Sequence, residues 1–243
     1  MKGPRNTITL SDSVHHQLNM YALAASAAGV SVLALPQPAE CKIIYTHAHK
    51  TIVTNERYNL DLNHDGVADF IVSNVLVAPF GSLLVCAANA RGTCLYAHSQ
   101  QKNEIWGKPN QHRNWAYALA AGVKVEPNPR RFLPKNSYMA GFSCDPSGCT
   151  HPSDNGPWKG NVRGRYLGLK FIIGGQVHYG WARLNVSYKT GSNGGKYLQA
   201  TLTGYAYETI ANKPIIAGQE HGKDEATLGR LALGASDVVS RQK

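Results

Sequence analysis

The sequence predicts a mainly β protein whose body is an antiparallel, jelly-roll-like β-sandwich. Polar and apolar residues alternate along several runs in the C-terminal half of the chain. Glycine (24) and tyrosine (12) are plentiful, and only 16% of the residues are charged, against roughly 25% in an average domain. This balance favours strands and turns over helices.

Three consecutive runs carry the clearest strand signal. Gly174-Gly175 separates the first two and is typical of a hairpin turn. In the second run Leu184 and Val186 alternate with polar neighbours, so that one face can be exposed to water. We therefore expect a three-stranded antiparallel meander formed by residues 165–173, 176–188 and 196–208.

The N-terminal half contains shorter strand signals. Apolar runs predict strands at 42–49, 58–62, 70–77 and 82–88. Residues 100–160 are rich in Asn, Gly, Pro and Lys and are interpreted as long loops, with one short helix in the Ala-rich stretch 115–125. Residues 212–218 close the domain.

The first 39 residues have the order of a secretory signal peptide. Lys2 and Arg5 precede a charge-free run at 20–35, and the small residue Ala39 follows. We expect a signal helix that is removed near Ala39, which places the mature protein outside the cytoplasm, in the periplasm, in the medium or at the cell surface. A membrane span, which needs about 20 apolar residues, and a buried helix are the alternatives.

The chain is thus divided into a signal peptide (1–39), a β-sandwich domain (40–218) and a linker with a degenerate C-terminal tail (219–243). The tail contains a weakly apolar stretch at 226–235 that predicts a short helix. Because this stretch is short and interrupted by Arg230, we expect no stable membrane span in the mature chain.

An acidic loop at 61–69 carries the one motif with specific chemistry, D-x-N-x-D-G-x-x-D. Calcium binds six to eight oxygen atoms, and alternate side chains of a tight loop can point toward one ion. Gly66 permits the sharp turn that such a loop requires. The predicted calcium ligands are the side chains of Asp61, Asn63, Asp65 and Asp69 and the carbonyl group of Val67.

The loop is not an EF-hand. An EF-hand needs a bidentate Glu at its twelfth position, where this chain has Val72 in an apolar run. The alternative to a calcium site is an Asx-rich β-turn that binds no metal.

Five cysteines suggest an oxidising compartment. Cys86 and Cys94 enclose a short Gly-containing stretch, and Cys144 and Cys149 enclose a turn sequence, so that each pair can close a local disulfide. A zinc site built from these four residues is the alternative, although neither pair has the two-residue spacing of common zinc knuckles. Cys41 has no assigned role.

The formal net charge of +10 suits acidic partners. An acidic polysaccharide or another envelope component is the expected partner, while a solvated basic surface is the simpler interpretation. The chain contains no recognisable nucleic-acid-binding module, so no specific nucleic acid is expected.

Other residues suggest weaker site hypotheses. His47 and His49 lie two apart on an expected strand and could begin a zinc or copper site, although surface histidines are the commoner case. Aromatic residues in the meander could form a sugar-stacking surface or could pack in the core. The four that define this possible ligand surface are Tyr179, Trp181, Tyr205 and Tyr207.

Three stretches together resemble a group of uncharacterised exported bacterial proteins of the PEP-CTERM kind. These stretches are 61–70, 178–183 and 200–208 with Ala217-Gly218. The acidic loop itself resembles the calcium loops of FG-GAP, thrombospondin type 3 and dockerin-like modules. The resemblance implies secretion and a β-sandwich body, and it implies no activity.

The sequence therefore predicts a secreted or cell-envelope module, stabilised by calcium, that binds a ligand or serves as a structural part. The alternative is a secreted hydrolase acting on polysaccharide or a similar polymer, which would need two suitably placed carboxylates. Glu208 is the first candidate for such a role, but acids are few outside the loop. No catalytic residue is assigned.

Overall fold

A computed structural model describes residues 42–89, 93–94, 103–110, 113–134, 136–145, 148–192 and 194–222, with the backbone alone at residues 145 and 148–152. The chain divides into two units, Met1–Glu40 and Cys41–Lys243, and every described residue belongs to the second. The expected signal helix, the role of Cys41 and the expected tail helix fall outside the described residues.

The described residues form fourteen strands and no helix. Twelve strands belong to one sheet, and β7 and β14 form a separate pair. The strands are β1 (Ile43–Ile52), β2 (Arg57–Leu60), β3 (Phe70–Val77), β4 (Phe80–Ala87), β5 (Glu104–Lys108), β6 (Trp115–Ala116), β7 (Lys124–Val125), β8 (Phe132–Leu133), β9 (Ser137–Asp145), β10 (Gly148–Asn155), β11 (Arg165–Ile173), β12 (Gln176–Thr190), β13 (Lys196–Glu208) and β14 (Ile215–Ile216).

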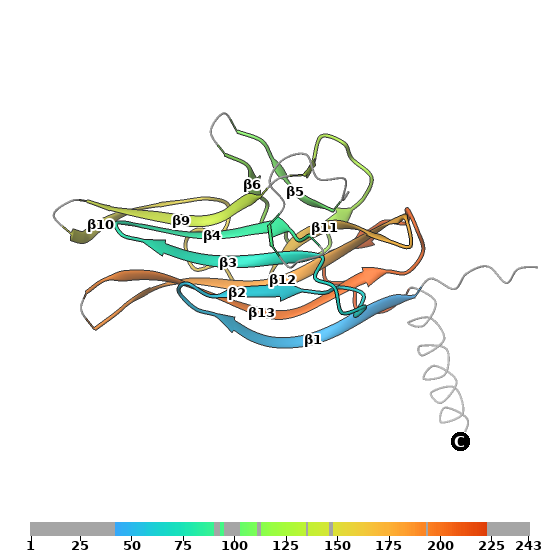
Figure 1. The fold of residues 1–243 in the computed structure, drawn as a ribbon, viewed down its shortest axis with the longest axis horizontal. Coiled ribbons are helices and arrows are strands. Elements are labelled where there is room, and N and C mark those ends of the chain that lie inside the picture. Colours follow the sequence, from blue (N-terminus) through green and yellow to red (C-terminus); the bar gives the residue numbers. More distant parts are fainter. Residues whose placement is uncertain are drawn as a thin grey trace, which may run out of the picture. The chain divides into compact units, whose positions relative to one another are not determined.

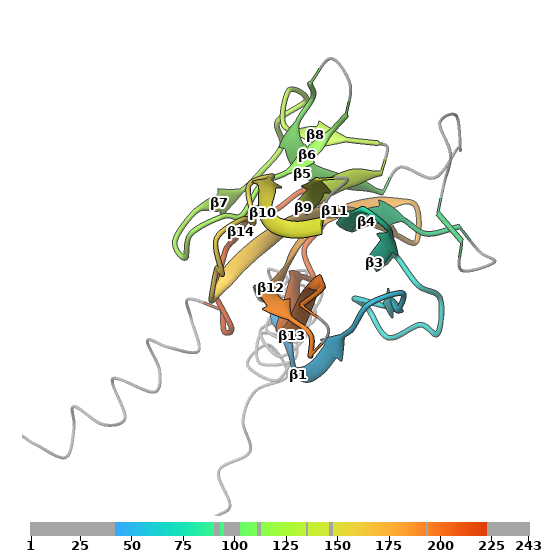
Figure 2. The ribbon, with the colours of Figure 1, turned by 90° about the vertical axis from the view of Figure 1, so that its left-hand side faces the viewer.

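The large sheet is nearly closed and barrel-like. Its strand order is β1-β13-β12-β11-β5-β6-β9-β4-β3-β2, with β10 beside β9 and β8 beside β5. Among the described strands, only β6 and β9 pair in parallel. Figure 1 shows β3, β4 and β9 running above β13 and β1, and Figure 2 shows the strands curving around the interior. The prediction of a mainly β, antiparallel protein is confirmed, and the jelly-roll-like sandwich stays a prediction.

The meander predicted in the C-terminal half is the longest paired part of the sheet. β11 pairs with β12 from Arg165↔Leu184 to Ile173↔Gln176. Gly174 and Gly175 form the turn between them with φ values of 55° and 81°, a backbone region that favours glycine. β13 pairs along β12, and β1 pairs with the other edge of β13. The first strand of the described chain thus lies beside the last long one.

Two groups of buried side chains cover the two faces of this meander. The main core fills the inside of the curved sheet and includes Phe70, Leu83, Leu184 and Leu202. A second cluster covers the outer face near the ends of β11, β12 and β13, where β7, β8 and β14 contribute Val125, Phe132 and Ile215. The central strands are therefore buried on both faces over part of their length.

The helix predicted for residues 115–125 is wrong. Its backbone groups pair with distant segments instead: Tyr117 N–H donates to the Trp106 carbonyl at 3.0 Å, and Leu119 N–H to the Tyr166 carbonyl at 2.9 Å. These bonds to other strands replace the local bonds that a helix requires. The surrounding region is likewise not a set of long loops, because β5 to β10 lie within it.

The two ends of the sheet meet at a seam between β1–β13 and β2–β3. Asn74 of β3 lies in this seam with 2% of its surface exposed. Its side-chain amide donates to the Leu198 carbonyl at 2.7 Å and to the Ile52 carbonyl at 3.3 Å. One buried side chain thus joins β3 to β13 and to β1, which no ladder of backbone hydrogen bonds connects to β3.

Candidate functional site

The acidic loop 61–69 joins β2 to β3 at one end of the seam. A hydrogen bond joins the two ends of the loop: Asp69 N–H donates to the Leu60 carbonyl at 2.9 Å. The chain then enters β3, and the Asp69 carbonyl accepts from Ala88 N–H at 2.9 Å. The loop is therefore held at its base by two paired strands.

The loop's carboxylates turn inward and accept backbone hydrogen bonds. Asp61 Oδ2 accepts from Gly66 N–H at 2.8 Å. Asp65 Oδ1 accepts from Val67 N–H at 2.8 Å, and Asp69 Oδ2 accepts from Leu62 N–H at 2.9 Å. Each carboxylate thus fixes a different part of the loop.

Gly66 has the backbone conformation that the motif predicts. Its φ of 86° lies in the region that favours glycine, and a Cβ atom there would meet nothing within 4 Å. The requirement for glycine is therefore conformational rather than steric.

Two oxygen atoms of the loop are buried and lack a partner among the described residues. They are Asp61 Oδ1 and Asn63 Oδ1. The Asn63 amide donates to Asp65 Oδ2 at 2.9 Å, which leaves its oxygen free to accept. A buried polar atom without a partner costs about 1–3 kcal/mol, so these oxygens are suited to a cation that would bind them.

The charge of the loop is also uncompensated. Every other carboxylate side chain in the described part of the chain lies in an ion pair with a lysine or arginine: Glu56, Glu104, Glu126, Asp154, Glu208 and Glu220. Within the same residues, Asp61, Asp65 and Asp69 have no such partner.

The pKa of Asp69 reflects both its burial and the negative charges of the loop. Its burial raises the pKa of the carboxyl group to about 7, the Leu62 hydrogen bond opposes the shift, and the charges of Asp61 and Asp65 add to it. A cation between these groups would relieve the repulsion that they impose on Asp69.

In the described residues, no three or more His, Cys, Asp and Glu side chains form a group that could hold a metal ion. Asp61, Asp65 and Asp69 therefore do not form such a group, and the predicted ligand set also needs the Asn63 side-chain oxygen and the Val67 carbonyl. Calcium binding by this loop stays a prediction.

His64 attaches the loop to strands across the seam. It has a positive φ of 59°, and its Nε2 atom lies in hydrogen-bonding contact with the Thr46 hydroxyl at 2.8 Å. Its ring centroid lies 5.7 Å from that of Tyr205. Nothing in the sequence signals these contacts, because β1 and β13 are far away along the chain.

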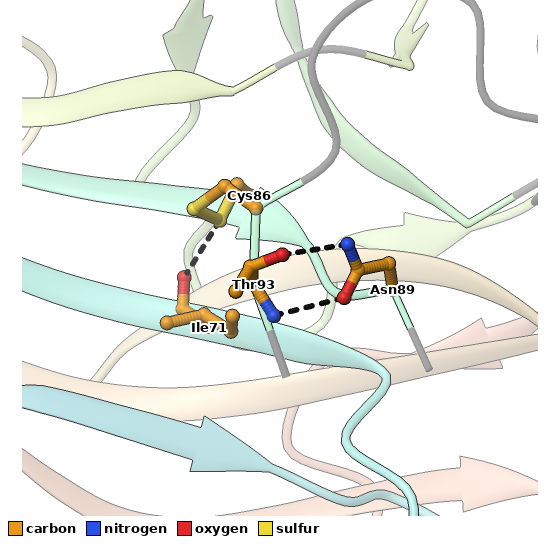
Figure 3. Close-up of a disulfide and its surroundings, with 5 residues drawn as sticks. Ile71, Cys86, Asn89 and Thr93 are labelled. Carbon is orange, nitrogen blue, oxygen red and sulfur yellow. Dashed lines mark hydrogen bonds between the residues drawn. A yellow bond between two sulfur atoms is a disulfide. The ribbon is translucent and has the colours of Figure 1, made fainter. Parts of the chain in front are cut away.

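The predicted disulfide Cys86–Cys94 is confirmed, with a Cα–Cα distance of 5.5 Å. Figure 3 shows it beside Ile71, whose carbonyl oxygen lies 3.7 Å from Cys86 Sγ. The Asn89 side chain nearby donates to the Thr93 hydroxyl and accepts from the Thr93 backbone N–H. Cys144 is also disulfide-bonded.

The side chain of Cys149 lies outside the described residues, so the second predicted pairing stays a prediction. A bonded sulfur is not available as a thiolate ligand, which argues against the four-cysteine zinc site.

The four aromatic residues considered as a ligand surface lie in the core. Tyr179, Trp181, Tyr205 and Tyr207 expose 3%, 0%, 6% and 7% of their surface. They pack inside the two hydrophobic clusters and against other rings. These rings therefore have no exposed face on which a sugar could stack.

The remaining candidates are placed apart from one another. Glu208 is 1% exposed, accepts from Ile210 N–H at 3.1 Å and pairs with Lys213 at 3.6 Å. His47 and His49 are exposed on β1, where the pairing with β13 is interrupted by a bulge between His47 and Lys50.

Comparisons with known proteins identify no relative: no protein-family model, curated protein or solved structure matches the chain. The resemblance to PEP-CTERM proteins and to FG-GAP-like loops stays a prediction. Among the residues that the structure describes, no helix has the length and apolar character needed to cross a membrane.

Proposed function

We propose that this chain is an exported, calcium-stabilised β domain that serves as a binding or structural module of the cell envelope. One observation carries the proposal. The loop 61–69 contains three carboxylates that lack a cationic partner among the described residues, and two of its side-chain oxygens, Asp61 Oδ1 and Asn63 Oδ1, are buried and unpartnered. This is the environment that a bound cation would stabilise.

The donor chemistry favours calcium over softer metals. The candidate ligands are all oxygen atoms, from Asp61, Asn63, Asp65 and Asp69 and from the Val67 carbonyl. Zinc and copper favour sulfur and imidazole ligands, and the one histidine of the loop, His64, is engaged with Thr46. Calcium accepts such an irregular set of oxygens more readily than magnesium, which requires near-octahedral geometry.

Export is supported by the cysteines and by the N-terminal sequence. A disulfide persists in oxidising compartments, and Cys86–Cys94 is such a bond. The charge-free run at 20–35 adds the composition of a secretory signal.

A binding or structural role is favoured over hydrolysis. A polysaccharide hydrolase needs two carboxylates on either side of its substrate. Outside the loop, the described carboxylate side chains lie in ion pairs with lysine or arginine, and the first candidate, Glu208, is buried. These contacts favour a binding or structural role.

Calorimetry and thermal melting of the full chain test the calcium proposal. We expect calcium uptake at micromolar to millimolar concentration and a lower melting temperature after chelation. Asp65→Ala should abolish both responses, whereas Glu126→Gln, which removes an exposed carboxylate outside the loop, should leave them intact. Unchanged melting after chelation, with no heat of calcium binding, would show that the loop is an ordinary acidic turn.

A further inference from the structure

A polar groove lies on the outer surface of the β12–β13 hairpin, away from the acidic loop in sequence. It encloses about 430 Å³, within the roughly 300–1,000 Å³ range of small-ligand sites. Its floor is formed by outward-facing residues of the hairpin, including Asn185, Gln199 and Thr201. Their neighbours Leu184, Val186 and Ala200 point into the core, so that the floor is rigid.

A short segment at 161–164 forms one wall of the groove. It lies along β12 just before the start of β11, where Val186 N–H donates to the Val162 carbonyl at 2.9 Å. Asn161 Oδ1 accepts from Tyr188 N–H, and Asn185 Oδ1 accepts from Gly164 N–H, both at 2.8 Å. These three bonds hold the wall in place without any ligand.

The same bonds determine which polar groups of Asn161 and Asn185 are available to a ligand. A backbone N–H can bond only to an acceptor, so each side chain must turn its oxygen toward the backbone and its NH₂ group elsewhere. In the described residues, neither NH₂ group has a partner, and the Gln199 amide has none. The groove therefore presents amide groups that are oriented in advance.

Two basic side chains complete the groove. Arg163 and Lys189 line it and are exposed, and neither forms an ion pair with the described residues. None of the ten described residues that line the groove is acidic. Two positive charges beside several amide and hydroxyl groups suit a ligand that carries both carboxylates and hydroxyls.

We propose that this groove binds an acidic saccharide, with Arg163 and Lys189 engaging a uronate carboxylate and the amides of Asn161, Asn185 and Gln199 bonding to ring hydroxyls. The proposal rests on the binding role proposed above and gives that role a site and a ligand class. It does not depend on the calcium loop, which shares no residue with the groove.

A saccharide fits the groove better than a nucleic acid does. Single-stranded nucleic acids are bound by exposed aromatic rings and by many basic side chains along a track. The one aromatic residue of the groove, Tyr188, turns its hydroxyl to the Gly141 carbonyl at 3.2 Å and its ring to Lys196 Nζ at 4.5 Å. That ring is therefore already engaged.

Isothermal titration calorimetry of the full chain tests the proposal with a hyaluronan hexasaccharide, which alternates a uronate with a neutral sugar. The carboxyl-reduced hexasaccharide is the neutral control, and a single-stranded oligonucleotide of equal charge is the competitor. We expect binding of the acidic sugar alone. Arg163→Ala and Lys189→Ala should each weaken binding by about tenfold, as expected for the loss of a charge-assisted hydrogen bond.

Matched variants separate the groove from general charge. Arg57→Ala combined with Lys108→Ala removes the same charges from exposed positions on β2 and β5 and should leave the affinity unchanged. Gln199→Ala should weaken binding by about threefold at unchanged net charge, as expected for a neutral hydrogen bond.

The proposal is overturned by the absence of sugar binding, by a loss of affinity in the Arg57→Ala and Lys108→Ala double variant that equals the loss in Arg163→Ala or Lys189→Ala, or by tighter binding of the oligonucleotide. Asp65→Ala keeps the groove and should keep its affinity, so that a failed calcium site and a failed groove are distinguishable.

Discussion

Asp61→Asn should change the stability of the protein in opposite directions with and without calcium. The substituted amide can still accept the Gly66 N–H bond through its oxygen, so the shape of the loop is retained. Without calcium, it removes one of the charges that raise the pKa of Asp69, and we expect a gain of about 0.5 kcal/mol at a pH near 8.

With calcium, the same substitution removes a ligand. At a hundredfold excess of calcium over Kd, the wild-type chain gains about 2.7 kcal/mol, and a variant with a hundredfold weaker site gains only about 0.4 kcal/mol. After the 0.5 kcal/mol of relieved repulsion is subtracted, Asp61→Asn should be about 2 kcal/mol less stable than the wild-type chain.

Urea unfolding in chelator and in excess calcium measures both values. Glu126→Gln is the control, because it removes a carboxylate that is paired with Lys124 outside the loop; its difference in unfolding free energy from the wild-type chain should be the same in both buffers. If the difference between Asp61→Asn and the wild-type chain is also the same in both buffers, the loop binds no calcium and the reasoning from its unpartnered oxygens fails.

Three further predictions concern the rest of the domain. Asn74→Asp places a carboxylate against the Ile52 and Leu198 carbonyls and should lower the unfolding free energy by about 3 kcal/mol. The control Asn59→Asp, at an exposed position, should lower it by less than about 0.5 kcal/mol. Urea unfolding compares the two variants, and equal losses would contradict the role of Asn74. Replacing both Cys86 and Cys94 with Ser should cost up to about 2.5 kcal/mol in the same assay, and no cost would mean that the bond leaves the unfolded chain unconstrained. Burial raises the pKa of Tyr188, and the Asp154 charge adds to the shift, so the neutral phenol stabilises the fold below the ordinary pKa near 10 and this contribution is lost as pH rises above it. Tyr188→Phe should therefore lose about 1 kcal/mol at neutral pH, through the bond to Gly141, and should show a shallower loss of stability in alkali; parallel pH profiles of the two proteins would count against this.

The strands predicted correctly are those whose pattern is local. Phe70–Val77 is a mainly apolar run that only Ser73 and Asn74 interrupt, and the meander is defined by alternation and by the Gly174-Gly175 turn. Each signal is contained within the segment that forms the strand, so a reading of neighbouring residues is sufficient.

The strands that were missed depend on distant partners. β6 and β7 have two residues each, and their alanine-rich surroundings favour a helix when judged locally. The backbone groups of Tyr117 and Leu119 instead bond to Trp106 and Tyr166. A sequence pattern cannot register such a pairing before the fold brings the segments together.

The two proposed sites also differ in how far a local sequence pattern can predict them. The acidic loop is a contiguous motif, so its predicted ligands can be named from spacing alone, and the positive φ of Gly66 agrees with the motif. The groove joins residues 161–163 to β12 and β13, and its amides acquire their orientation from tertiary hydrogen bonds. The burial of Tyr179 and Trp181 could not be predicted from the sequence either, because it depends on which face of the meander the second cluster covers.

The acidic loop contacts the seam, so the proposed calcium binding would affect more than the loop itself. Thr46 and Tyr205 are paired residues of β1 and β13, and His64 contacts both. Asn74 holds the other end of the same two strands. A cation that fixes the loop would therefore fix His64 against one end of the seam while Asn74 holds the other. His64→Ala should leave calcium affinity nearly unchanged but should reduce the stability that calcium confers on β1. Amide hydrogen exchange of β1, with and without calcium, measures this stability. Equal protection of β1 by calcium in the wild-type chain and in His64→Ala would show that the loop does not stabilise the seam through His64.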